Sequence, residues 1–302
     1  MDYLDIKGPC SFKGTVSVSS SKNASLPILA ATLLYPGKCS FTNLPELSDI
    51  DFFIQILQSL GATCSKDSVD ASKITSYQAD YDLVRKMRAS VLVLGPLLSR
   101  FKQARVSLPG GCAIGSRPVD IHLSGMEKLG AKIKIEAGYI EASCNELKGA
   151  KIVLPFPSVG ATENLMMAAA YAKGETVIDN AAREPEIEDL ANFMIKLGFD
   201  VKGAGSSTIS INGKQIDEIG TKEVVHEIIG DRIEAATYII GALITNSEAR
   251  IEGFKSAHLD IVLDTLKTMG AQLKIEENAV EVKKSGQLSG VRVETAPYPG
   301  FP

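Results

Sequence analysis

The chain has 302 residues, of which 45% are hydrophobic and 23% are charged. This composition supplies enough apolar side chains for a packed core and is too apolar for a broadly disordered protein. The 32 Lys and Arg residues against 36 Asp and Glu give a formal net charge of −4, so there is no general attraction to nucleic acid or to an anionic membrane. We therefore expect neither as a partner.

The apolar stretches are too short to cross a membrane. The longest ones, 89–98 and 235–245, are interrupted by Gly or polar residues and fall short of the ~20 residues that a spanning helix needs. The N-terminus carries two acidic residues, Asp2 and Asp5, among its first five, whereas a secretory signal begins with basic residues and continues with apolar ones. These features predict a cytoplasmic protein.

A pattern of about 70 residues repeats along the chain. Gly61, Gly130, Gly198 and Gly270 each close an amphipathic run, and an acidic residue precedes each glycine by ten positions. A carboxylate stabilises the first turn of a helix, and a glycine can adopt the left-handed conformation at its end. The alternation of apolar and polar residues after each glycine predicts a β-hairpin.

Each repeat also holds an earlier, nearly apolar helix, predicted at 24–34, 87–99, 162–172 and 233–245. Because apolar residues cover every side of these helices, we expect them in the interior. One repeat then consists of a strand, a buried helix, a strand, an amphipathic helix and a hairpin. The sequence therefore predicts an α/β fold built from βαβαββ units, several of which assemble into one domain.

The last residues resemble the beginning of another repeat. A predicted strand at 291–294 and the loop at 295–302 match the stretch 151–160, which precedes the third buried helix. No helix follows to bury that strand. We therefore expect the chain to be a fragment, or to be completed by a missing segment.

Polar and basic residues gather where the buried helices are predicted to begin. The helix N-terminus offers exposed amides and a positive dipole, which favour phosphate, and cations strengthen that preference. At any one position, a helix cap or a solvated cation is the alternative interpretation. The segments are Ser21-Lys22-Asn23, Arg85-Lys86-Met87-Arg88, Ser158-Val159-Gly160-Ala161-Thr162 and Asp231-Arg232.

The segment 108–120, Leu-Pro-Gly-Gly-Cys-Ala-Ile-Gly-Ser-Arg-Pro-Val-Asp, combines a cysteine, a cation and several glycines. Its glycines and Pro109 predict a mobile loop that could close like a lid. Pro118 suits the first turn of the next helix, which places Arg117 at the N-terminus of that helix. Such surroundings lower the pKa of a thiol, so Cys112 is a candidate reactive group. An incidental thiol in a flexible turn is the alternative.

No metal or cofactor site is predicted. The five cysteines are scattered without a Cys-x-x-Cys pair, and His122, His226 and His258 are the three histidines, which argues against a disulfide framework and a zinc site. Gly203-Ala204-Gly205 lies between alternating apolar runs and is more typical of a hairpin turn than of a dinucleotide-binding loop.

These motifs resemble those of the UDP-N-acetylglucosamine 1-carboxyvinyltransferase family, which belongs to the enolpyruvyl transferases. The resemblance covers almost the whole chain and rests on residues 21–27, 86–90, 108–120, 157–162, 181–186 and 231–234. The enolpyruvyl transferase of the shikimate pathway shares the fold but not the Cys-containing loop, and it is one alternative. A non-catalytic module that binds a UDP-sugar is another.

The resemblance implies a two-domain inside-out α/β barrel with three βαβαββ units in each domain and the active site in the cleft between them. The first domain would comprise residues 22–229. The second would combine 1–21 with 230–302 and would be incomplete.

The resemblance also implies a reaction at the start of peptidoglycan synthesis. The 3-hydroxyl of UDP-N-acetylglucosamine adds to C2 of phosphoenolpyruvate, and phosphate leaves from a tetrahedral intermediate. Lys22 with Asn23 would hold phosphoenolpyruvate. Arg117 would neutralise phosphate charge. The UDP-sugar would contact Arg88, Arg117, Pro118, Val119, Asp120 and Ile121, and its diphosphate would receive donors from Ser158, Val159 and Gly160. Phe156 stands where some relatives carry Lys, which puts a cationic contact there in doubt.

The same resemblance makes Cys112, Lys22 and Arg117 the catalytic residues. Cys112 would protonate C3 of phosphoenolpyruvate and would form adducts with it or with the epoxide antibiotic fosfomycin. The aspartate commonly assigned as the base in this family would follow Pro302 by about two residues. We therefore expect negligible turnover from this chain alone.

Overall fold

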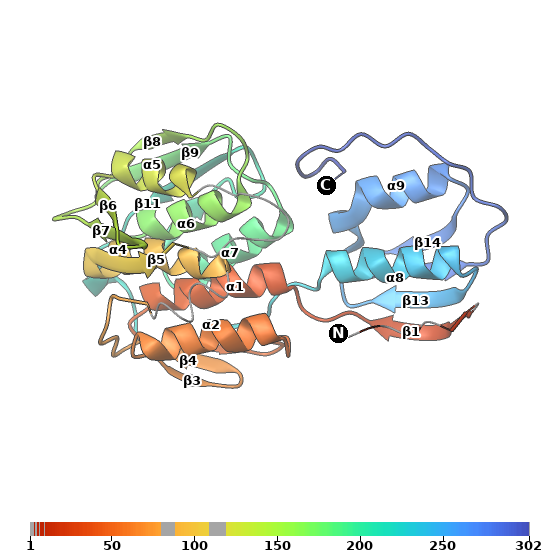
Figure 1. The fold of residues 1–302 in the computed structure, drawn as a ribbon, viewed down its shortest axis with the longest axis horizontal. Helices are drawn as coiled ribbons and strands as arrows, with labels where there is room; N and C mark the ends of the chain where they lie inside the picture. The colour runs from red at the N-terminus through yellow and green to blue at the C-terminus, as the bar shows by residue number, and fades with distance from the viewer. Residues whose placement is uncertain are drawn as a thin grey trace. The chain divides into compact units, whose positions relative to one another are not determined.

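The computed structural model describes residues 3, 5, 7, 8, 10–79, 88–108 and 119–301. The chain forms two compact units, of which the larger is Lys22–Ile228 and the smaller combines Met1–Ser21 with Ile229–Pro302. The second boundary between the units lies between residues 228 and 229. The sequence predicts it one residue later, between 229 and 230. Each unit contains helices that cover small sheets (Figure 1).

The larger unit contains three successive repeats, which we give in chain order. The first repeat comprises α1 (Lys22–Ala31), η1 (Thr32–Leu34), β2 (Lys38–Phe41), α2 (Ser48–Ser59), β3 (Thr63–Ser65) and β4 (Ser68–Asp70). The second comprises η2 (Arg88–Val93), α4 (Leu94–Phe101), β5 (Gln103–Ser107), α5 (Asp120–Lys128), β6 (Lys132–Glu136) and β7 (Tyr139–Ser143). The third comprises β8 (Lys151–Val153), α6 (Val159–Ala169), β9 (Glu175–Asp179), α7 (Pro185–Lys196), β10 (Asp200–Lys202) and β11 (Thr208–Asn212).

The third repeat has the predicted βαβαββ order. Its sheet runs β10-β11-β9-β8, with β8 parallel to β9 and the hairpin antiparallel. After η3 (Ile216–Glu218), the last strand of the unit, β12 (Val224–His226), pairs in parallel with β2 and thereby supplies the first strand of the first repeat. The sheet of the second repeat has the order β5-β7-β6. The predicted repeat is therefore confirmed in the fold.

The first buried helix of each repeat lies in the interior of the larger unit, as the sequence predicts. Every residue from Ala24 to the end of α1 is buried, as is every residue of α6 from Ala161 onward. In α4 the buried residues run from Leu94 to Ser99. The second helix begins differently from the prediction, because residues 88–93 form the tighter 3-10 helix η2 and the α-helix starts only at Leu94.

The smaller unit has one sheet and two helices. Its elements are β1 (Lys13–Ser17), α8 (Arg232–Ile244), β13 (Glu248–Glu252), η4 (Ser256–Leu259), α9 (Asp260–Thr268), β14 (Gln272–Glu276) and β15 (Ala279–Lys283). The strand order is β1-β13-β15-β14, with β1 parallel to β13. The core joins one side of α8 and α9 to the sheet through residues such as Ile239, Leu263 and Val280.

Two predictions for this unit are wrong. Helix α8 is not interior, since the exposed fractions of Ile233, Ile240 and Ile244 are 51%, 40% and 76%. Its other side packs on the sheet, and the described part of this unit offers no second layer of helices to cover the exposed side. Residues 291–294 form no strand. Alternation alone does not make a strand, because strand formation depends on packing against neighbouring strands.

All four amphipathic helices end in the same way, which confirms the predicted role of their glycines. Gly61, Gly130, Gly198 and Gly270 have φ values of +104°, +96°, +104° and +100°. Each glycine N–H donates to the carbonyl three residues earlier at 2.9–3.0 Å, and the next N–H donates to the carbonyl five residues before it at 3.0–3.1 Å. This pair of bonds is the Schellman motif.

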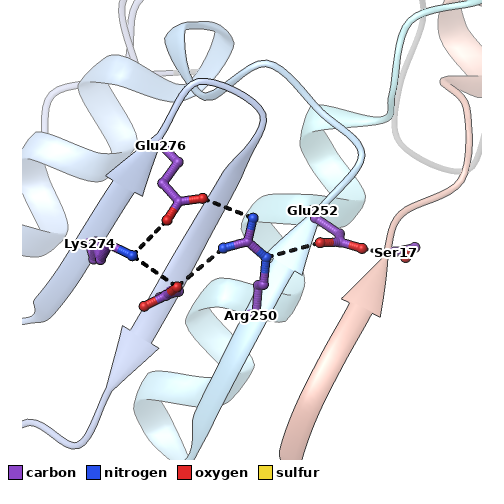
Figure 2. A network of polar contacts seen from close by, with 6 residues as sticks. Ser17, Arg250, Glu252, Lys274 and Glu276 are labelled. Atoms are coloured by element: carbon purple, nitrogen blue, oxygen red, sulfur yellow. Dashed lines mark hydrogen bonds and ion pairs between the residues drawn. The ribbon is translucent and has the colours of Figure 1, made fainter.

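A network of charged side chains crosses the sheet of the smaller unit (Figure 2). The guanidinium of Arg250 on β13 lies 2.9 Å from Glu252, 2.9 Å from Glu276 and 3.2 Å from Glu281. Lys274 on β14 lies 2.7 Å from Glu276 and 3.1 Å from Glu281. Ser17 on β1 donates a hydrogen bond to Glu252 at 3.2 Å. The network therefore connects all four strands.

Candidate functional site

Helix α1 presents its first two residues to solvent at the predicted phosphoenolpyruvate position. The Nζ of Lys22 lies 2.9 Å from Oδ2 of Asp49 on α2, and the exposed fractions of the two side chains are 42% and 39%. Asn23 is exposed. Because an exposed ion pair contributes only ~0–1 kcal/mol, an incoming anion can replace Asp49 at little energetic cost.

The start of α6 carries the three residues predicted to bind a diphosphate. Ser158 caps the helix, and its Oγ accepts a hydrogen bond from the Ala161 amide at 3.4 Å. Its hydroxyl hydrogen is a separate donor. Val159 and Gly160 belong to the first turn, where amide groups have no carbonyl partner within the helix. The cap and the anion site are therefore compatible functions of one turn.

Three further residues predicted to contact the UDP-sugar, Val119, Asp120 and Ile121, lie at the start of α5. The helix begins at Asp120, after Val119 at the N-cap position, whereas the sequence places Pro118 in its first turn. Val119 is half-buried, Asp120 is exposed and Ile121 is 9% exposed. Cys112, Arg117 and Pro118 lie outside the described residues, and so does the side chain of Arg88.

Two buried polar side chains connect α6 with η2, α4 and α5. Asn164 of α6 exchanges hydrogen bonds with the backbone of η2 and α4, and its amide nitrogen lies 3.1 Å from Nδ1 of His122 on α5. Helix α1 packs against both η2 and α6. The structure therefore packs α1, η2, α5 and α6 of the larger unit against one another, while the meeting of their starts at one site stays a prediction.

The fourth predicted helix start belongs to the smaller unit. Asp231 caps α8, and its Oδ1 accepts hydrogen bonds from the amides of Ile233 at 2.8 Å and Glu234 at 3.0 Å. Arg232 is 9% exposed, and its guanidinium lies 5.2 Å from the centre of the Tyr298 ring. For Asp231, the capping alternative describes the observed contacts.

Sequence reasoning missed the buried acidic groups beside the site. Glu163 is 4% exposed, and burial raises the pKa of its carboxyl well above the usual range, with a further increase from the charges of Glu186 and Glu184. His122 and Asn164 were missed as well. The available signal was the Glu163-Asn164 pair, which places two polar residues inside an otherwise apolar run.

The described cysteines differ from the setting predicted for Cys112. Burial raises the pKa of the Cys39 thiol to about 12 and that of the Cys64 thiol to about 11. Burial also raises the pKa of the Cys144 thiol. These thiols stay protonated near neutral pH and are poor nucleophiles. Cys10 is exposed.

The described residues hold neither a metal-binding cluster nor a membrane-spanning helix. No group of three or more His, Cys, Asp or Glu side chains in these ranges could hold a metal ion. No helix in the same part of the chain has the length and apolar character needed to cross a membrane.

Comparison with known proteins gives consistent results for sequence and fold. Residues 6–302 match the family model described as EPSP synthase (3-phosphoshikimate 1-carboxyvinyltransferase). The whole chain aligns at 49% identity with 72% of the UDP-N-acetylglucosamine 1-carboxyvinyltransferase of Geotalea daltonii. It aligns at 49% identity with 73% of the UDP-N-acetylglucosamine 1-carboxyvinyltransferase 2 of Carboxydothermus hydrogenoformans.

Two solved structures share the fold. The enolpyruvyl transferase NikO from Streptomyces tendae superposes with a TM-score of 0.84 at 22% identity, over 97% of this chain and 71% of that one. An EPSP synthase from Acinetobacter baumannii superposes with a TM-score of 0.72 at 21% identity, over 94% and 67% of the two chains. The two-domain enolpyruvyl transferase fold that the sequence predicts is thereby confirmed, while the predicted incompleteness of the second domain stays a prediction.

Proposed function

Because the chain belongs to the UDP-N-acetylglucosamine 1-carboxyvinyltransferase family, we propose that it acts on UDP-N-acetylglucosamine and phosphoenolpyruvate, at the start of peptidoglycan synthesis. The observation that carries this proposal is the 49% identity over the whole chain. The shikimate-pathway alternative has weaker support, since the superposed EPSP synthase is only 21% identical.

The proposed reaction is an addition followed by an elimination. The 3-hydroxyl oxygen of the sugar bonds to C2 of phosphoenolpyruvate, the hydroxyl proton goes to a base, and C3 receives a proton from an acid. Loss of phosphate from C2 and of a proton from C3 then restores the double bond in the enolpyruvyl ether. Each step moves negative charge near phosphate, so fixed cations and amide donors are the groups that stabilise it.

Phosphoenolpyruvate is assigned to the start of α1. Lys22 supplies a cation whose ion-pair partner in the described part of the chain is the half-exposed Asp49, and Asn23 supplies an exposed amide. Arg117 would add a second cation. The start of one helix together with an ammonium group is a suitable phosphate site, since both favour the anion in the same place.

The UDP-sugar is assigned to the starts of α5, η2 and α6. The Ser158 hydroxyl and the amides of Val159 and Gly160 are the donors for its diphosphate. Val119, Asp120 and Ile121 would contact the nucleotide, together with Arg88, Arg117 and Pro118. Phe156 is 51% exposed, which leaves room for a nucleotide but supplies no charge.

Cys112 is assigned both proton donation to C3 and adduct formation. The first role needs the thiol and the second needs the thiolate, so a pKa near the working pH serves both. The raised pKa values of Cys39 and Cys64 make these residues unsuitable for either role, which supports the assignment.

The remaining properties follow from composition. A net charge of −4 gives no general attraction to nucleic acid, so the phosphorylated substrates depend on local cations and amide donors. Cys10, Cys39, Cys64 and Cys144 are all free thiols, which supports a reducing compartment such as the cytoplasm.

Calorimetric titration of the 302-residue chain tests the proposal. UDP-N-acetylglucosamine should bind, and shikimate 3-phosphate should give no heat of binding at the same concentrations. Ser158→Ala should weaken binding of the sugar nucleotide, while Ser206→Ala, on the exposed turn before β11, should leave it unchanged. Preference for shikimate 3-phosphate would overturn the proposal in favour of the sibling activity.

A further inference from the structure

Three segments assigned to the UDP-sugar meet at one buried side chain. Asn164 is fully buried in the second turn of α6. Its Oδ1 accepts a hydrogen bond from the Gly95 amide at 2.7 Å, and its Nδ2 donates to the Val91 carbonyl at 3.0 Å. The same Nδ2 lies 3.1 Å from Nδ1 of His122, which is 5% exposed.

The backbone partners determine the orientation of this amide. The Gly95 N–H can only donate and the Val91 carbonyl can only accept, so the Asn164 oxygen must face Gly95 and its nitrogen must face Val91. Nδ2 carries a second hydrogen, and the group it meets is Nδ1 of His122. That nitrogen must therefore be an acceptor, and the imidazole is the neutral form with its proton on Nε2.

The imidazole in turn lies beside the predicted diphosphate site. A Cβ atom placed on Gly160 would lie 3.4 Å from Cε1 and 3.7 Å from Nε2 of His122. The ring therefore borders the first turn of α6, which contains Ser158 and Gly160. His122 itself lies in the first turn of α5, directly after Asp120 and Ile121. One hydrogen-bonded unit thus determines the spacing of both turns.

We infer that Asn164 and His122 are positioning residues for the sugar nucleotide. They touch no substrate in this assignment and act by holding the starts of α5 and α6 at a fixed distance from η2 and α4. Because the sugar nucleotide must meet its diphosphate donors on α6 and its nucleotide contacts on α5 at once, a change in that distance weakens its binding even when each contacting group is intact. This inference rests on the proposed function of the site.

A network of this kind could also serve stability alone, so the variants must separate the two effects. Asn164→Asp keeps the shape and the acceptor for Gly95 but removes both donors, which leaves an oxygen facing the Val91 carbonyl. His122→Gln removes the acceptor at the Nδ1 position. Tyr171→Phe is the matched control, since it removes a buried hydrogen bond of 2.6 Å to the Leu34 carbonyl, beyond the C-terminal end of α6.

The test combines calorimetric titration of UDP-N-acetylglucosamine with thermal unfolding of the same 302-residue chains. Asn164→Asp should raise the Kd by about tenfold, which corresponds to about 1.4 kcal/mol, and His122→Gln should raise it in the same direction. Tyr171→Phe should lower the unfolding temperature without changing the Kd. If Asn164→Asp does not fold, His122→Gln decides the question.

A double-mutant cycle with Ser158→Ala gives a readout that a purely structural role would not move. If Asn164 acts through the first turn of α6, its effect on the Kd should shrink once Ser158 has lost its hydroxyl. The inference would be overturned if the effects of Asn164→Asp and Ser158→Ala on the Kd were additive, or if Asn164→Asp left the Kd unchanged. It would also be overturned if Tyr171→Phe raised the Kd as much as Asn164→Asp does. Failure of the unmodified chain to bind the sugar nucleotide would instead overturn the proposed function.

Discussion

The ammonium of Lys22 has a carboxylate partner that an anionic ligand must displace. Asp49 lies 2.9 Å away, and both groups are about two-fifths exposed. In the proposed site, this carboxylate neutralises the cation and also repels the incoming phosphate.

Asp49→Asn should therefore tighten the binding of phosphoenolpyruvate. From the ~0.2–1 kcal/mol that an exposed pair contributes, we expect a decrease in Kd of about 1.4- to fivefold. Titration calorimetry in the presence of saturating UDP-N-acetylglucosamine measures it. Asp51→Asn, two residues further along α2, removes the same charge from an exposed position and serves as the control. A weaker or unchanged affinity in Asp49→Asn would refute this account of Lys22.

The buried carboxyl of Glu163 predicts that the stability of the fold depends on pH. Its carboxyl has a raised pKa in the folded chain because burial disfavours the charged form. The native state therefore holds this proton at pH values where the unfolded chain has lost it, and its contribution to stability decreases as the pH rises from ~4.5 toward the folded pKa.

Glu163→Gln removes that dependence. The unfolding temperature of the variant minus that of the unmodified chain should become more positive between pH 5 and pH 8. Glu127→Gln, on the exposed side of α5, is the control. A difference that stays constant over this range would show that Glu163 does not titrate as its surroundings imply.

At this scale, the sequence predicts which residue types stand at helix starts but not which side chains connect them. Ser158 and Asp231 are found as caps because capping depends on neighbours in sequence. The contact of Asn164 with Val91, Gly95 and His122 joins residues that are 42 to 73 positions apart. Only the packed arrangement of three helices creates it.

At the scale of the elements, the Schellman motif is the most regular feature of the fold. Gly270 has φ of +100°, and a Cβ atom there would meet nothing within 4 Å. Any effect of a side chain is therefore due to backbone conformation rather than to a steric clash.

Gly270→Ala should lower the free energy of unfolding by about 1–2 kcal/mol, the cost of a left-handed conformation for a residue with a Cβ atom. Denaturant unfolding measures it. Gly286→Ala is the matched control, because that glycine also has open space but no positive φ. Equal effects of the two substitutions would contradict the assigned role of Gly270.

The charged network on the smaller sheet predicts a loss of stability in acid. Hydrogen bonds from Arg250, and then from Lys274, lower the pKa of Glu276 to about 2. A carboxylate with a lowered pKa stabilises the fold above its unfolded value of ~4.5, and this contribution is lost as the pH falls through the folded value.

Glu276→Gln should lower the unfolding temperature at pH 7 and have little effect at pH 2. Thermal unfolding from pH 7 to pH 2 tests this, and high salt should reduce the difference because these groups are solvent-accessible. Glu277→Gln, at the next position, removes a charge that forms no ion pair among the described residues. A Glu276 effect that is independent of pH would exclude the network as its cause.

Element prediction succeeded where local chemistry determines the structure and failed where a partner is needed. Helix ends at Gly61 and Gly130 depend on one backbone conformation, which the residue type reveals. The apolar helix α8 and the strand predicted at 291–294 both require neighbours that lie outside the pattern itself. Ile244 is consequently 76% exposed.

For the whole molecule, the spacing of about 70 residues between the repeated glycines correctly predicted the α/β units. The comparisons confirmed the enolpyruvyl transferase fold. The assignment of individual site residues rests on the family motifs and remains a proposal. Within the larger unit, α1 packs against η2 and α6, and α5 packs against α6. The proposed function depends on substrate binding at the starts of these helices.

The most direct measurement is the rate at which fosfomycin alkylates Cys112, followed by mass spectrometry of the intact chain and its peptides. If Lys22 and Cys112 serve one phosphoenolpyruvate site, phosphoenolpyruvate should slow the reaction by competition. Lys22→Met should slow it by roughly tenfold or more, because a charge-assisted hydrogen bond to the phosphonate contributes ~1.5–3 kcal/mol. Reaction at the exposed Cys10 is the internal reference. Equal rates at Cys112 with and without Lys22 or phosphoenolpyruvate would contradict the account.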